Sequence, residues 1–145
     1  MFRKLFAIAV FALLSMPAFG ANGSGQNSDL TLLTLTAAGA STVNSPDQIN
    51  ATGRCAQVGI NLTTMTTAAI VVTVQGKDAS GTYYTLLASA SISSTGFTLM
   101  TICPGSPTTT NVSAALPLPR TWRVSATITG ASAAANGKIS ASVIQ

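Results

Sequence analysis

Residues 121–129, TWRVSATIT, alternate strictly between two kinds of side chain. One side of this extended segment is apolar and carries Trp122, Val124, Ala126 and Ile128. The other side is polar and carries Arg123, Ser125 and Thr127. A period of two residues is typical of a β-strand with one buried face, so this stretch predicts a β-protein.

Six further segments have β-type patterns, and they cover residues 30–36, 54–63, 70–75, 83–92, 97–103 and 138–144. In 83–92 the alternation predicts one shared face for Tyr84, Leu86, Ala88, Ala90 and Ile92. Residues 97–103 are apolar on both faces. No segment repeats apolar residues at a sustained helical period. The sequence therefore predicts an all-β fold: a single antiparallel β-sandwich of about seven strands, Ig-like.

Turn residues separate these segments. The loop within residues 74–83 contains Asp78, Ser80 and Gly81 between two strand patterns, which predicts a hairpin. Residues 106–119 hold three prolines and are expected to cross between sheets or to form a surface loop. Residues 131–137 end in Asn136-Gly137 and are interpreted as a turn.

The first 20 residues have the three-part pattern of a signal peptide. Arg3 and Lys4 precede an apolar run over residues 5–16, and Ala18 and Gly20 suit a cut before residue 21. A short membrane anchor and a buried helix are the alternatives, and Met16 could instead be the true start. We expect a leader at 1–20, a flexible segment at 21–28, and a β-sandwich domain at 29–145.

Charge is scarce: charged residues make up 7% of the chain, hydrophobic residues 47%, and the net charge is +4. Removing the leader leaves five basic and three acidic residues, a net charge of +2. The remaining basic residues are scattered along the chain: Arg54, Lys77, Arg120, Arg123 and Lys138. A nucleic-acid surface needs a clustered basic face, so no nucleic-acid partner is expected. The 12-residue apolar run is also too short for a stable membrane span, which takes about 20 residues.

Catalysis is not expected, because the residues that perform it are missing. The chain has no histidine, and its only carboxylate side chains are Asp29, Asp47 and Asp78. No catalytic residue, cofactor or metal ligand is predicted. A calcium site at Asp78 and Ser80 is the alternative, but a single carboxylate in a turn usually stabilises the turn itself.

The two cysteines, Cys55 and Cys103, suggest a disulfide in an exported protein. Cys55 alternates with Gln57, Gly59 and Asn61, opposite the apolar face of its segment. This phase favours a lateral link on an outer face over a pin between sheets. Free thiols and an interchain bridge remain alternatives, and a β-bulge would reverse the face.

Among the aromatic residues, Tyr84 and Trp122 are interpreted as core residues. Tyr83, at the hairpin mouth, is the candidate contact residue, together with Arg120 and Arg123. Four Asn-X-Ser/Thr sequons begin at Asn22, Asn50, Asn61 and Asn111, and a glycan partner is a further hypothesis.

Several stretches resemble a family of small phage virion structural proteins, some of them head-decoration proteins. They are Gly53-Arg54, residues 58–63 (VGINLT), 73–78 (TVQGKD), 80–89 (SGTYYTLLAS), Pro104-Gly105 and 118–124 (LPRTWRV). The similarity covers roughly residues 53 to 128, and its motifs are structural. The resemblance implies a non-enzymatic β-sandwich that decorates or cements a capsid or tail, with other virion proteins or itself as partner.

The chain departs from this family at two points. Relatives carry apolar or aromatic residues where Cys55 and Cys103 stand, and a signal peptide is unexpected in a phage capsid protein. The alternative is a secreted bacterial surface protein, such as a fibre subunit or a carbohydrate-binding module. The expected location is thus the virion, or else outside the cytoplasm.

Overall fold

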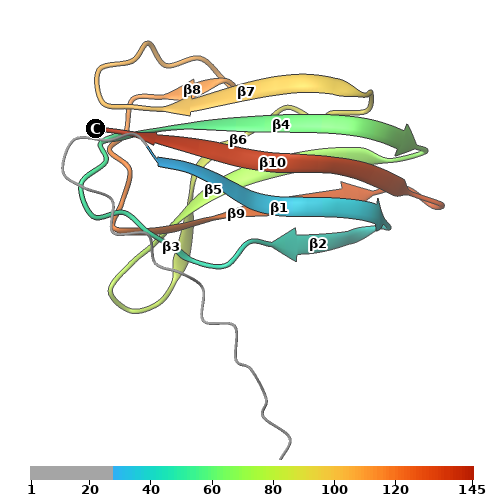
Figure 1. The fold of residues 1–145 in the computed structure, drawn as a ribbon, viewed down its shortest axis with the longest axis horizontal. Helices are drawn as coiled ribbons and strands as arrows, with labels where there is room; N and C mark the ends of the chain where they lie inside the picture. The colour runs from blue at the N-terminus through green and yellow to red at the C-terminus, as the bar shows by residue number, and fades with distance from the viewer. Residues whose placement is uncertain (1–27) are drawn as a thin grey trace, which may run out of the picture.

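The computed structural model describes residues 28–145, which fold into two β-sheets packed face to face (Figure 1). One sheet, here called sheet A, has the strand order β1-β10-β4-β7-β8. The other, sheet B, has the order β2-β9-β5-β6, and β3 also pairs with β9. The described residues contain no helix, so the predicted all-β class is confirmed. The expected leader at 1–20, most of the segment at 21–28, Met16 and Asn22 lie outside the described residues.

The strands of sheet A are β1 (Ser28–Ala38), β4 (Cys55–Thr66), β7 (Gly96–Ile102), β8 (Ser113–Ala114) and β10 (Ala134–Ile144). Those of sheet B are β2 (Ser41–Asn44), β3 (Gln48–Ile49), β5 (Ala69–Lys77), β6 (Tyr83–Ala88) and β9 (Thr121–Thr129). All strand pairs are antiparallel except β7 with β8.

The eight longer strands follow the path of a jelly roll. The chain changes sheet between β1 and β2, between β3 and β4, between β4 and β5, between β6 and β7, between β8 and β9, and again between β9 and β10. Only the β5–β6 hairpin joins neighbours within one sheet among these eight. Such a double-sheet arrangement with wrapped connections defines the jelly roll. The first and last strands, β1 and β10, consequently lie side by side.

Each of the seven expected strands is present, but the Ig-like sandwich of seven strands is not confirmed. The structure adds β2, β3 and β8, which give ten strands in the two sheets. In an Ig-like sandwich the last two strands share a sheet, whereas β9 and β10 lie in different sheets. The long connection at 106–119 does cross between sheets, as expected, with β8 inside it.

The core consists of the inward faces predicted by alternation. Trp122, Val124, Ala126 and Ile128 are buried, as are Val58, Ile60, Leu62, Ile70, Val72 and Val74. The residues pack into one cluster drawn from both sheets. At roughly 25 cal/mol per Å² of apolar surface, this burial is the main stabilising contribution to the fold.

Two sequence-based predictions are wrong in phase or position. The shared face proposed for residues 83–92 fails because β6 ends at Ala88 and a bulge shifts its register opposite Val74 and Gln75. Leu87 is buried instead, and Tyr84 remains 45% exposed rather than becoming a core residue. The turn expected at 131–137 is also shorter, because β10 already begins at Ala134 and passes through Asn136-Gly137 with a bulge.

Candidate functional site

The first candidate site is a polar group on the outer face of sheet B, here called the Tyr83 cluster. It consists of Asp47, Gln75, Lys77, Tyr83 and Arg123. Lys77 of β5 and Tyr83 of β6 are paired across the mouth of their hairpin. Arg123 of β9 is paired with Gln75 of β5. Asp47 comes from the connection between β2 and β3. Neighbouring strands thus bring side chains from four separate segments together.

The contacts within the Tyr83 cluster are direct. Lys77 Nζ lies 2.8 Å from Asp47 Oδ2, and the Tyr83 hydroxyl donates to Asp47 Oδ1 over 2.6 Å. Arg123 Nε donates to Gln75 Oε1 over 2.9 Å. The ammonium of Lys77 lies 5.1 Å from the centroid of the Tyr83 ring. The guanidinium of Arg123 also lies over this ring, so both Lys77 and Arg123 are placed for cation–π attraction to Tyr83.

The Tyr83 cluster shifts the ionisation of its charged members. The hydrogen bond from Lys77, followed by that from Tyr83, lowers the pKa of Asp47 below its usual 3.8. The same hydrogen bond to Asp47 raises the pKa of Lys77 above its usual 10.5. Both groups are therefore charged at neutral pH, and they form an ion pair.

The hairpin loop beside the Tyr83 cluster is held by Asp78. Its Oδ1 accepts hydrogen bonds from the backbone N–H groups of Ser80 and Thr82 and from the Ser80 hydroxyl. The Ser80 hydroxyl, then the Thr82 backbone, lowers the pKa of Asp78. Gly81 supplies the positive φ of 89° that the loop requires. The Asp78 carboxylate thus performs turn chemistry, and residues 28–145 contain no cluster of metal-ligating side chains.

The predicted contact residues are distributed between two places. Tyr83 and Arg123 lie together, but Arg120 is exposed and only its backbone carbonyl is bonded, by the Asn50 N–H. Asp47, Gln75 and Lys77 were missed by the sequence analysis. No local signal identifies Asp47, because it lies 30 residues from Lys77 and meets it only through the sheet topology.

Cys55 and Cys103 form a disulfide that links the start of β4 to the residue after β7. Their Cα atoms are 4.3 Å apart, and the neighbouring residues Ala56 and Ile102 are paired. Because Ala56 and Ile102 are buried, the alternating phase places the cysteines on the outer side of sheet A. The lateral link predicted from the phase of Cys55 is therefore present.

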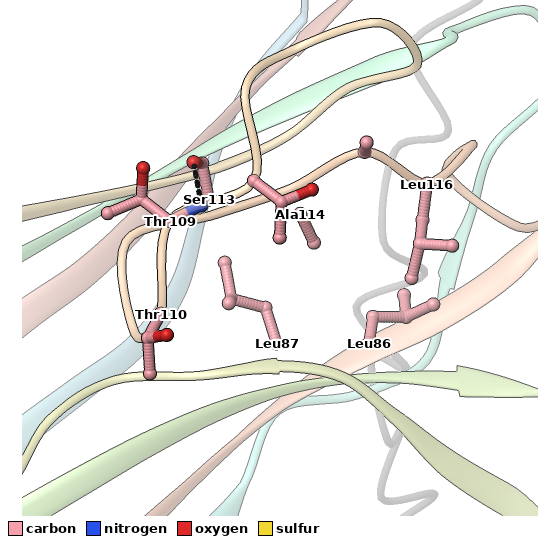
Figure 2. A pocket seen from close by; sticks show the side chains of 9 residues that line it. Leu86, Leu87, Thr109, Thr110, Ser113, Ala114 and Leu116 are labelled. Atoms are coloured by element: carbon pink, nitrogen blue, oxygen red, sulfur yellow. Dashed lines mark hydrogen bonds between the residues drawn. The ribbon is translucent and has the colours of Figure 1, made fainter.

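The second candidate site is an apolar hollow between edge strand β6 and the connection that contains β8, here called the β6–β8 hollow (Figure 2). It has a volume of about 360 Å³ and is lined by Leu86, Leu87, Thr108, Thr109, Thr110, Ser113, Ala114, Ala115 and Leu116. Figure 2 shows Leu86 and Leu87 rising from the strand toward Leu116 and Ala114 on the opposite wall. The β6 bulge interrupts the alternation of side chains, so the successive residues Leu86 and Leu87 both line the hollow.

Hydrogen bonds fix the wall opposite β6. The Ser113 hydroxyl donates to the Pro107 carbonyl over 2.6 Å, and the Thr109 N–H donates to Ser113 Oγ over 3.1 Å. Asn111, with a positive φ of 62°, donates from Nδ2 to the Ala88 carbonyl. The bond from Asn111 to Ala88 joins this connection to the end of β6. Both walls of the hollow are therefore held in place by hydrogen bonds.

The sequons within the described residues differ in availability. Asn50 donates from Nδ2 to the carbonyls of Gly53 and Leu118, and Asn111 is bonded to Ala88. Asn61 lies exposed on the outer face of sheet A. No helix among residues 28–145 is long and apolar enough to cross a membrane.

No protein-family model, curated protein or solved structure matches this chain. The similarity to phage virion proteins therefore stays a prediction from the quoted sequence stretches.

Proposed function

We propose that this chain is a non-enzymatic structural protein of a phage particle, which decorates or cements the capsid or tail. The observation that supports this role best is the β6–β8 hollow. It combines an apolar surface and a hydrogen-bonded wall with an edge strand whose outer backbone groups pair with no other strand among residues 28–145. An extended segment of another virion protein could add to such an edge and place apolar side chains in the hollow.

The described polar groups give catalysis little support. The ionised pair Asp47–Lys77 is satisfied by its own partners, and Asp78 is used in its turn. A general base works best with a pKa near the operating pH, whereas the pKa of both Asp47 and Asp78 is lowered below its usual value. A role in contact rather than in chemistry fits this distribution of groups.

A secreted bacterial surface protein is the second candidate, and the disulfide favours it. Disulfides form and persist mainly in oxidising compartments outside the cytoplasm. The Tyr83 ring is a weaker argument for glycan binding, because the Arg123 guanidinium already lies against it at 3.4 Å.

Retention of the chain on phage particles tests the proposed role as a virion structural protein. Leu116 contributes an exposed apolar side chain to the hollow, so Leu116→Asp should reduce the amount of chain that remains on particles after density-gradient purification by at least tenfold. Val112→Asp is the matched control, because Val112 is an exposed apolar residue of the same connection but does not line the hollow. Equal retention of both folded variants at the wild-type level would exclude docking through the hollow.

A further inference from the structure

The outer face of sheet A exposes a self-complementary arrangement of side chains. The strand registers place Thr31, Ser140, Gly59 and Leu99 in one row across β1, β10, β4 and β7. Figure 1 shows these four strands side by side. At its β1 and β10 end the row carries the small side chains Thr31 and Ser140, which allow another surface to approach closely.

Apolar side chains lie at the β7 end of this row. Leu99 is 43% exposed and Phe97 is 66% exposed. The Phe97 ring extends over Gly59, where an added Cβ would lie 3.0 Å from it. Aromatic cover of a glycine on a neighbouring strand explains the position of the ring, but it leaves most of the ring in solvent.

Two opposite charges flank the row at equal distances. Asp29 and Lys138 are the only charged side chains on β1, β4, β7 and β10. Asp29 pairs with Ser142 and Lys138 pairs with Thr34, so the charges lie two residues to either side of Ser140 and Thr31. Two residues along a strand correspond to about 6.6 Å.

We infer that this face binds the same face of a second copy of the chain. A two-fold axis along the central row reverses the strand direction and brings each Asp29 opposite the Lys138 of the other copy. The two charges are then offset by one strand spacing, about 4.8 Å, which a lysine side chain can span. The same operation brings Leu99 against its own counterpart. An isologous interface of this kind requires a patch that complements itself.

The area of the face indicates what kind of dimer to expect. Four strands about 4.8 Å apart, with about seven residues each, present roughly 450 Å² per copy. The total for two copies, roughly 900 Å², is below the range of stable specific interfaces, so we expect a weak dimer whose population depends on concentration. This inference does not depend on the proposed function, since the interface uses a different sheet face from the β6–β8 hollow.

Sedimentation velocity of the purified chain over a range of concentrations tests the inference. The wild type should form a dimer, and Asp29→Lys or Lys138→Asp alone should raise its Kd at least tenfold. The two changes in one chain recreate the pair with its charges exchanged, so the double variant should recover a Kd within a few-fold of the wild-type value. Leu99→Ser should also weaken the dimer, while Arg120→Asp, outside the face, should not.

A wild type that stays monomeric at every concentration would overturn the inference. So would a double variant no tighter than the single variants, provided that thermal unfolding shows it to be folded. Leu116→Asp should leave the dimer intact, which separates this test from that of particle binding.

Discussion

The guanidinium carbon of Arg123 lies 3.4 Å from the centroid of the Tyr83 ring. This contact joins β9 to β6 across the intervening strand β5. The Tyr83 hydroxyl continues the connection to Asp47, in the segment between β2 and β3. One half-buried aromatic residue, Tyr83, thereby connects the β5–β6 hairpin to β9 and to the segment between β2 and β3.

The Asp47 carboxylate should make the stability of the fold depend on pH in the acidic range. Its pKa is lowered in the folded state, so its contribution is complete above the usual value of 3.8 and is lost as pH falls through the lowered value. Asp47→Asn should therefore reduce the melting temperature by a few degrees at about pH 6, with the difference shrinking below about pH 4. Thermal unfolding of both chains across this range measures the effect. A difference that is constant with pH would contradict it.

The disulfide should be the largest single stabilising link. Cys55 and Cys103 are 48 residues apart in sequence, and closing a loop of that size is worth up to about 4 kcal/mol in the chain-entropy treatment. The Cys55→Ser, Cys103→Ser double variant should lose stability by an amount approaching this, measured by urea unfolding. A reductant should lower the stability of the wild type to that of the variant and leave the variant unchanged.

Two buried serines should be structurally sensitive. Ser45 Oγ accepts the Val124 N–H over 3.0 Å, and Ser89 Oγ accepts the Val72 N–H over 2.9 Å. Each hydroxyl replaces a ladder bond where a strand of sheet B ends. Ser45→Ala or Ser89→Ala should cost about 1–3 kcal/mol, because a buried N–H loses its partner. Ser132→Ala, at an exposed turn position, is the control and should have no measurable effect on urea unfolding.

Gly76 should tolerate no side chain while Tyr84 is present. An added Cβ would lie 2.6 Å from the Tyr84 ring and 2.9 Å from Pro119 Cγ. Gly76→Ala should thus destabilise the fold by about 1–3 kcal/mol through overpacking. In the Tyr84→Ala background the penalty should fall, and a double-mutant cycle by urea unfolding quantifies the coupling. A cycle without coupling would assign the cost to the backbone instead.

Local sequence patterns were enough to predict several strands and the position of the disulfide. Alternation over residues 121–129 predicted the bounds and inward face of β9, and the phase of Cys55 predicted a lateral disulfide. These features depend on one strand and its immediate neighbours, so the order of side chains is enough to determine them.

The β6 bulge, the short strands and the jelly-roll path could not be predicted from local sequence patterns. The β6 bulge reverses the phase of Leu87 without any glycine or proline to signal it, and β2, β3 and β8 exist only because longer strands pair with them. The jelly-roll path likewise depends on which sheet each connection enters, which period-two patterning does not encode. The β6–β8 hollow follows from the bulge and the path together, although the apolar Leu116 in a proline-rich connection was visible in the sequence.

Quantitative mass spectrometry of purified phage particles tests the central proposal most directly. If the chain is a virion structural protein, its peptides should occur at a fixed ratio to the major capsid protein, and this ratio should persist through successive density gradients. The most N-terminal peptide would also show whether the mature chain begins near Ala21 or near Met16. Absence from the particles, together with abundant chain in the culture medium, would contradict the proposal and favour a secreted surface protein.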